Sequence, residues 1–292
     1  MLPFSLTLLS KSVTGIALLR DLKIELTVAH PVPFTIRNQD SDHVKAFKWE
    51  SIIDEHGQII VLTEEQQRKR CQKYVKDNLR DVLVRENLCV VGAEEGPNIL
   101  SVVVPGYDIE LVGRTDLLIM SDVVKEYPHY MERLPGVKML IDVKRNAKTD
   151  PGAVYQTVSE LIALDFLASD LVMALLTDFT DYWEFFWISD RSNNYVNIRY
   201  VPVAHPSAAF AMIRVLLTQS DAEISFPWVE EPVKRCKLKQ VLPASEGGGS
   251  SGIIEAIERY RDIESVLGPD TGMAREVGRQ VVRSIPIFSM YT

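Results

Sequence analysis

The sequence predicts a mixed α/β (α+β) protein, in which helices flank a mixed central sheet. Two stretches of helical periodicity, at 64–86 and from residue 151 onward, alternate with short apolar runs of strand-type composition. Hydrophobic residues make up 46% and charged residues 25% of the 292 residues, which is typical of a globular protein. This composition excludes a chain that is disordered, collagenous or coiled coil as a whole.

Residues 1–60 are predicted to form a strand-rich N-terminal extension. Apolar runs at 16–19 and 24–28 have the length of strands, and the second ends before a Pro-rich breaker at 30–33. Another short apolar segment, at 59–62, precedes the first strong helix signal.

A core at 61–220 is predicted to begin with a long helix. Thr63 is the expected N-cap, and Gln66, three residues later, completes a capping box. The helix should run over 64–86. Apolar side chains recur at helical spacing and predict one buried face, made of Tyr74, Val75, Leu79, Val82 and Leu83.

The rest of the core is predicted to alternate strands with two further helices. Strands rich in Val, Ile and Leu are expected at 88–92, 100–104, 109–120, 137–143, 171–177, 182–189 and 195–203, with a polar, aromatic loop at 122–136. Asp150 is placed to cap a helix that starts at Pro151 and runs to about residue 168. Pro206 is expected to open the next helix.

The chain is predicted to end in a linker and a helical tail. Residues 221–252 read as a loop and a Gly/Ser linker, which is either natural or an engineered join. Residues 253–292 form the expected C-terminal helical segment. Its apolar face, which should pack on the main body or on another chain, contains Ile254, Ile257, Tyr260 and Ile263.

Charge and cysteine usage predict an intracellular, reducing environment. The net charge of −8 argues against a broad nucleic-acid surface but leaves room for a local basic groove. The three cysteines lack paired spacing, and the five histidines never stand at metal-ligand spacing. We expect no signal peptide and no membrane span, because no uncharged apolar window of about 18 residues occurs.

One set of polar residues could carry chemistry. Asp142 and Lys144 alternate with apolar neighbours and therefore share one face of a strand, and Asp116 opens a strand expected beside it. Two carboxylates with an ammonium suit a hard cation such as Mg²⁺ and a phosphate substrate. Gln156 and Glu160 lie one helical turn apart and could orient the water or the substrate.

A purely structural interpretation of these residues is also open. An Asp and a Lys on an amphipathic strand are commonly its solvated face, and Asp116 could belong to a turn. If the set is catalytic, Lys144 is expected on the active face and not in the core, so that its truncation would cost little stability.

The residues GRTD at 113–116, IDVK at 141–144 and Gln156 resemble the motifs of the PD-(D/E)XK, or restriction-endonuclease-like, nuclease superfamily. The order of elements is also similar: a helix, three antiparallel strands, a helix and a further strand. Glu160 departs from the RecB-like branch, in which a tyrosine is usual. The resemblance implies Mg²⁺ (or Mn²⁺) held by Asp116 and Asp142.

The same resemblance implies roles for the surrounding side chains. Lys144 would position or activate the attacking water, and Gln156 would orient it. The expected contacts to the substrate come from Arg114, Arg145, Lys148 and Glu160.

A narrower resemblance, over about residues 60–220, is to the C-terminal nuclease-like domain of Crinkler-type effectors. It is carried by VGRTDLLIM, IDVKR, YQTVSELIALDFLA and LLTDFTDYWEFFWIS. Those proteins have a TDG-x-x-W-x-F hairpin, and here Phe179 stands in place of the Gly. The resemblance implies a protein secreted by a pathogen or symbiont that acts on DNA in a host nucleus.

Several alternatives remain open from the sequence. The fold could be catalytically inactive and serve as a binding module for DNA, another nucleic acid or a host protein, with a second copy of the chain as a further candidate partner. The aromatic run at 182–187 could be a strand packed on both faces or a base-stacking platform. A basic cluster at 234–239 could be a solvated run, a localisation signal or a nucleic-acid patch.

Overall fold

A computed structural model describes residues 3–5, 12–30, 44–53, 55–92, 99–107, 109–219, 222–225, 229 and 231–242. These residues belong almost wholly to one compact unit, Met1–Val104 with Ile109–Leu242. The Gly/Ser linker and the predicted helical tail lie outside the described residues.

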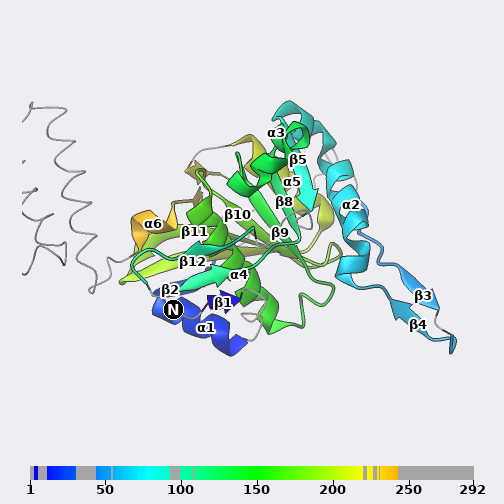
Figure 1. Cartoon of the computed structure of the whole chain (residues 1–292), viewed down its shortest axis with the longest axis horizontal. Coiled ribbons are helices and arrows are strands. Elements are labelled where there is room, and N and C mark those ends of the chain that lie inside the picture. Colours follow the sequence, from blue (N-terminus) through cyan, green and yellow to red (C-terminus); the bar gives the residue numbers. More distant parts are fainter. Residues whose placement is uncertain are drawn as a thin grey trace, which may run out of the picture. The chain divides into compact units, whose positions relative to one another are not determined.

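A mixed seven-stranded sheet forms the centre of the described part of the chain, which confirms the predicted α+β class (Figure 1). The outer pair β12–β2 and the inner pair β9–β10 are parallel, and the other neighbouring pairs are antiparallel. In spatial order the strands are β2 (Ile24–Val28), β12 (Tyr195–Val203), β11 (Trp183–Ser192), β10 (Met173–Thr177), β9 (Met139–Val143), β8 (Leu117–Ser121) and β5 (Leu88–Gly92).

Helices cover both faces of this sheet. On one face α2 (Glu64–Arg85) and α5 (Pro206–Thr218) bury their apolar sides in a core that contains Ile141 and Val143 of β9. The alternate residue, Asp142, points to the opposite face and meets α4 (Pro151–Leu167). One face of the sheet therefore packs against the apolar core. The opposite face carries the polar side chain of Asp142 near the end of β9.

The predicted strand at 16–19 is wrong, because these residues lie inside helix α1 (Ser12–Asp21). Leu18, Leu19 and Leu22 are buried together at helical spacing. A Cβ on Gly15 would come within 2.4 Å of the Tyr155 Cβ, so the glycine lets α1 approach α4 closely. The predicted strand at 24–28 is confirmed as β2.

The start of α2 is confirmed in detail. Thr63 accepts a hydrogen bond from the Gln66 backbone, and the Gln66 side chain accepts one from the Thr63 backbone at 2.9 Å. Val75, Leu79, Val82 and Leu83 form the buried face as predicted, with Tyr74 packed against it.

Two predicted elements differ from the structure. The segment 109–120 contains two strands, β7 (Glu110–Val112) and β8, and β7 pairs with β1 (Pro3–Ser5) and β6 (Val102–Val103) in a separate small sheet. Gly113 and Arg114 interrupt the apolar pattern at the point where the strand breaks. The predicted loop at 122–136 holds two short helices, α3 (Val123–Glu126) and η2 (Pro128–Arg133).

Two minor hairpins complete the described strands. The pair β3 (Ser51–Ile53) and β4 (Ile59–Val61) projects from the sheet near the start of α2 (Figure 1), and all its side chains are exposed. The other pair, β13 (Glu223–Ile224) and β14 (Val233–Lys234), is followed by α6 (Leu238–Val241).

The aromatic run packs inside the protein. Trp183, Phe185, Phe186 and Trp187 are each no more than 1% exposed, which confirms the strand packed on both faces. Phe179 in the preceding turn has a φ of 60°, the left-handed region that favours glycine. Its side chain is fully buried.

The aromatic neighbours of Phe179 are Phe47, Tyr74 and Trp183, with ring centroids 5.3 to 6.0 Å away. The left-handed turn therefore carries a bulky side chain into a cluster of rings.

The basic cluster at 234–239 is only partly solvated, because Arg235 and Lys237 are buried. The Lys237 ammonium lies 3.0 Å from Asp165 Oδ1 and also donates to the carbonyl oxygens of Asp165, Ala168 and Asp170 near the end of α4. This cation anchors the segment before α6 to the helix and is not available to a ligand.

The three cysteines all lie within the described ranges. Cys71, Cys89 and Cys236 are free thiols, and the first two are buried. None of the described helices combines the length and the apolar character that crossing a membrane requires.

Candidate functional site

The two motif carboxylates come together through the pairing of β8 with β9. The antiparallel register places Leu117 opposite Ile141, so Asp116 and Asp142 stand opposite each other one position beyond. Opposed residues of an antiparallel pair lie on the same side of the sheet. Asp116 and Asp142 therefore share a face at one end of these strands.

Asp116 is held by the backbone of the neighbouring strand. Its Oδ2 accepts a hydrogen bond of 2.8 Å from the Val143 amide, and its Oδ1 lies 3.7 Å from an Arg68 guanidinium nitrogen. Burial and the nearby Asp142 charge raise the pKa of Asp116 to about 6, against the opposing effects of Lys144, this hydrogen bond and Arg68. Asp116 therefore takes up a proton at a higher pH than an ordinary aspartate does, while remaining mainly ionised at neutral pH.

Asp142 is almost completely buried, with 1% of its side chain exposed. Lys144 Nζ lies 3.1 Å from its Oδ1, and the Thr157 hydroxyl on α4 lies 2.7 Å from its Oδ2. The Thr157 hydroxyl is also 2.9 Å from the Ala153 carbonyl oxygen, and its single proton can serve only one of the two acceptors at a time. A buried charge of this kind is stable only because it is paired.

Lys144 is partly buried, with 27% of its side chain accessible. Burial opposes its charge, but Asp142, Asp116 and Glu160 together raise the pKa of Lys144 above its ordinary range. The side chain lies beside Asp142 and outside the apolar core, as expected, and strand alternation does not predict its depth. Lys144 is a permanent cation at neutral pH.

Gln156 and Glu160 contact each other on α4 as their spacing predicts. Gln156 Nε2 donates to Glu160 Oε1 at 2.9 Å. Glu160 is fully buried, and its Oε2 has no hydrogen-bond partner among the described residues. Burial and the charge of Asp142 raise the pKa of Glu160 well above its ordinary range. The structure places Glu160 inside the protein, within electrostatic reach of Asp142.

The three basic residues predicted to contact substrate lie in different surroundings, and all are exposed. Arg114 precedes Asp116 by two residues and lines a pocket with Arg68. Arg145 donates from its backbone to Glu64 Oε1 at 2.8 Å and from Nη1 to the Val61 carbonyl at 3.3 Å.

Lys148 Nζ lies 3.6 Å from the exposed carboxylate of Asp181. Lys148 and Arg145 thus each have a local partner, whereas no partner of this kind engages Arg114 in the described part of the chain.

Sequence reasoning missed two members of this site, Arg68 and Thr157. A signal for Thr157 existed, since a hydroxyl follows Gln156 directly and stands among the apolar residues of a buried helix face. Arg68 is one of several cations on α2, and the sequence around it does not distinguish it from the others. Its contact with Asp116 depends on how α2 packs on the sheet.

The donor set suits a cation held by two carboxylates. No group of three His, Cys, Asp or Glu side chains within the described ranges is arranged to hold a metal ion. Mg²⁺ is often bound through one or two carboxylates, with water and substrate phosphates completing its ligands. Asp116 and Asp142 are the residues that could hold such an ion, which would offset the burial and the mutual repulsion that raise the pKa of Asp116.

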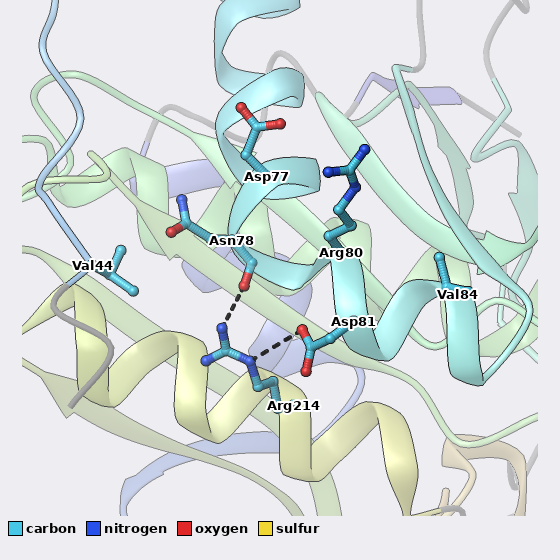
Figure 2. A pocket seen from close by; sticks show the side chains of 7 residues that line it. All are labelled: Val44, Asp77, Asn78, Arg80, Asp81, Val84 and Arg214. Carbon is cyan, nitrogen blue, oxygen red and sulfur yellow. Dashed lines mark hydrogen bonds and ion pairs between the residues drawn. The ribbon is translucent and has the colours of Figure 1, made fainter. Parts of the chain in front are cut away.

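A larger hollow, of about 680 Å³, lies elsewhere, between α2 and α5 (Figure 2). Figure 2 shows Arg214 turned toward α2, where it donates to the Asn78 carbonyl at 2.6 Å and lies 3.7 Å from Asp81 Oδ1. This hollow contains none of the motif residues. The lining residues are Val44, Asp77, Asn78, Arg80, Asp81, Val84 and Arg214.

Comparison with known proteins gives relatives of similar sequence. The chain is 49% identical over 290 residues to Crinkler effector protein 63 of Phytophthora sojae, covering 96% of this chain and 64% of the relative. It is 50% identical over 285 residues to Crinkler effector protein 2 of Phytophthora infestans, covering 96% and 60%. Crinkler effector protein 4 of Phytophthora capsici is 48% identical over 281 residues, covering 95% and 63%.

These relatives support the Crinkler resemblance along most of the chain, which itself spans somewhat less than two thirds of their length. No protein-family profile matches the sequence, and no solved structure matches it either.

Proposed function

We propose that this chain is a nuclease of the PD-(D/E)XK type that hydrolyses phosphodiester bonds in DNA with Mg²⁺ or Mn²⁺. The observation that carries the proposal is the placement of Asp116 opposite Asp142, with Lys144 Nζ 3.1 Å from the Asp142 carboxylate. The order α2, β5, β8, β9, α4, β10, in which β10 runs parallel to β9, matches the order of elements in that superfamily.

Asp116 and Asp142 would hold the cation. When bound, Mg²⁺ lowers the pKa of a water ligand and neutralises charge on a phosphate. The Val143 amide and the Thr157 hydroxyl fix the orientation of the two carboxylates before any ligand arrives. Pre-organised ligands of this kind lower the cost of assembling the site.

Lys144 would act through its charge. Its raised pKa keeps the proton on Nζ at neutral pH, so the residue cannot serve as the base that deprotonates water. In hydrolysis the water oxygen bonds to phosphorus, the ester P–O bond breaks, and the leaving oxygen takes up a proton. An ammonium at this place stabilises the negative charge that develops on the phosphate oxygens.

Glu160 would act as a positioning group. Its buried carboxyl lies within electrostatic reach of Asp142 and Lys144, and Gln156 holds one of its oxygens at 2.9 Å. Its raised pKa allows a neutral carboxyl beside two acidic ligands, which limits the accumulated negative charge.

The names of the relatives suggest a biological role for the proposed activity. They are Phytophthora proteins named as effectors, and we extend the effector role to this chain. A nuclease of this kind would act on DNA in the nucleus of a host cell.

The test is cleavage of supercoiled plasmid by the purified chain in Mg²⁺, Mn²⁺ or EDTA. Cleavage is expected with either metal and not in EDTA. Asp142→Asn and Lys144→Met should each reduce it by at least about 100-fold, since both remove interactions with the transition state. Asp77→Asn, an exposed carboxylate on α2, is the matched control and should cleave like the wild type. Equal activity in all four proteins would contradict the proposal.

A binding module without turnover is the second candidate. The observation that favours it is the absence of a third metal-binding side chain in the described residues, together with donors already present at both Asp142 oxygens. Calorimetric titration with Mn²⁺ separates the two: heat of binding that disappears in Asp142→Asn supports the nuclease, and no heat in the wild type supports the module.

A further inference from the structure

A second pocket adjoins the two carboxylates. It has a volume of about 490 Å³ and opens between the first turns of α2 and the residues that lead into β8. Its lining residues are Glu65, Gln66, Arg68, Lys69 and Arg114. Arg68 belongs both to this pocket and to the site, because its guanidinium lies 3.7 Å from Asp116.

Besides Arg68, the pocket contains two cations, Lys69 and Arg114, whose side chains have no partner among the described residues. Lys69 and Arg114 are exposed, and neither side chain has an ion pair or a hydrogen bond within the described part of the chain. Other cations on α2 are paired with carboxylates: Arg70 lies 3.1 Å from Glu50, and Lys73 lies 2.6 Å from Asp77. Two cations without a carboxylate partner that line the same pocket indicate a binding site for an anion.

The geometry favours phosphate over other anions. Two guanidinium groups present planar forks that match phosphate oxygens, and a lysine adds a point charge. The pocket also lies at the first turns of a 22-residue helix, where the helix dipole favours an anion. Glu65 is the one carboxylate in the lining, and it is exposed.

We propose that this pocket binds a backbone phosphate of a DNA strand, next to the phosphate that lies at Asp116 and Asp142. The choice of DNA rests on the proposed function, whereas the phosphate subsite rests on the pocket itself. Because Arg68 contacts both the pocket and Asp116, the strand would pass directly from Lys69 and Arg114 to the carboxylates.

The test is DNA binding without cleavage. Fluorescence anisotropy of a labelled oligonucleotide is measured in EDTA over a series of KCl concentrations. Lys69→Ala combined with Arg114→Ala is expected to lower affinity about 10-fold at about 0.1 M salt. The slope of log K against log [salt] should also become shallower by roughly 0.7 to 0.9, the contribution of one phosphate contact.

The matched control removes the same number of positive charges, at two positions on α2 outside the pocket. Lys73→Ala combined with Arg85→Ala removes two cations of α2 that are paired with carboxylates, and both values should stay near those of the wild type. Arg68 is left intact so that the environment of Asp116 is unchanged. Circular dichroism and the unfolding midpoint confirm that both double variants are folded.

Three results would overturn the subsite: an unchanged slope in Lys69→Ala/Arg114→Ala, an equal loss in the control, or a wild-type chain that does not bind the oligonucleotide. Inorganic phosphate and a phosphopeptide are then added as competitors of the oligonucleotide. If either one abolishes the difference in affinity between the wild type and Lys69→Ala/Arg114→Ala, the pocket takes its phosphate from that source. Plasmid cleavage by the wild type reports separately on the proposed function, so that either idea can fail without the other.

Discussion

Replacing Asp116 by Asn is expected to stabilise the protein in the absence of metal. The amide oxygen of Asn can still accept the 2.8 Å hydrogen bond from the Val143 amide, so the link between the strands is kept. The substitution removes a negative charge that stands opposite Asp142. Asp116→Asn thus separates the charge of this residue from its part in the fold.

The magnitude follows from the pKa of Asp116. Folding raises it from the ordinary value of 3.8 to about 6. Each pKa unit corresponds to about 1.4 kcal/mol, so ionised Asp116 costs the folded state about 3 kcal/mol. The sign is that of a raised acid: between about pH 4 and 6 the folded state holds more protons than the unfolded state, and stability falls as the pH rises. Below that range the two states differ little.

Urea unfolding followed by tryptophan fluorescence measures the effect. In EDTA at pH 8 Asp116→Asn should exceed the wild type by up to about 3 kcal/mol, and near pH 4 the two should agree. Added Mg²⁺ should raise the stability of the wild type at pH 8 and leave the variant unchanged, because a bound cation stabilises only the state that binds it. Asp77→Asn, which is exposed and paired with Lys73, serves as the control and should change by less than about 0.5 kcal/mol.

A variant that is less stable than the wild type at pH 8 in EDTA would refute the reasoning. That outcome would mean that the attraction of Arg68 and Lys144 for Asp116 outweighs both its burial and its repulsion from Asp142.

Three further changes test other parts of the structure by urea unfolding. Lys144→Met should cost about 2 kcal/mol at pH 8 because Asp142 loses its cation, and less near pH 5, where Asp116 is protonated; a cost independent of pH would contradict this. Lys237→Met should cost about 3 kcal/mol because Asp165 stays buried without its cation, and Asp165→Asn in the same chain should recover part of it. Phe179→Ala should cost about 3 kcal/mol because a buried ring is lost. Phe179→Gly should cost about 1 kcal/mol less, although Gly is normally the more destabilising replacement, because Gly adopts the positive φ of this residue without strain. A Gly variant less stable than the Ala variant would argue against strain at this φ.

The elements that the sequence predicted are those with local signals. The capping box of Thr63 and Gln66 and the turn at Asp150 and Pro151 fix helix starts through contacts within a few residues. The strand at 195–203 carries its own β-type composition and agrees with the structure at both ends. The run at 16–19 was misassigned because four apolar residues fit either period, and its packing against α4 decided the outcome.

The sequence predicted which residues of the candidate site lie together, but not how deeply their side chains are buried. Alternation and motif order brought Asp116, Asp142 and Lys144 to one place, since strand pairing follows from the order of the elements. The degree of burial, and the contributions of Arg68 and Thr157, depend on helices that pack from distant parts of the chain. Residue patterns do not carry that information.

Phe179 has a consequence for how relatives of this chain can differ from it. An exchange between Phe and Gly at this turn changes two things at once, the freedom of the backbone and the volume of the aromatic cluster. A relative with Gly at this position must fill the space beside Phe47, Tyr74 and Trp183 with other atoms. Substitutions at these four positions should therefore be correlated across relatives, and single exchanges that ignore the correlation should be rare.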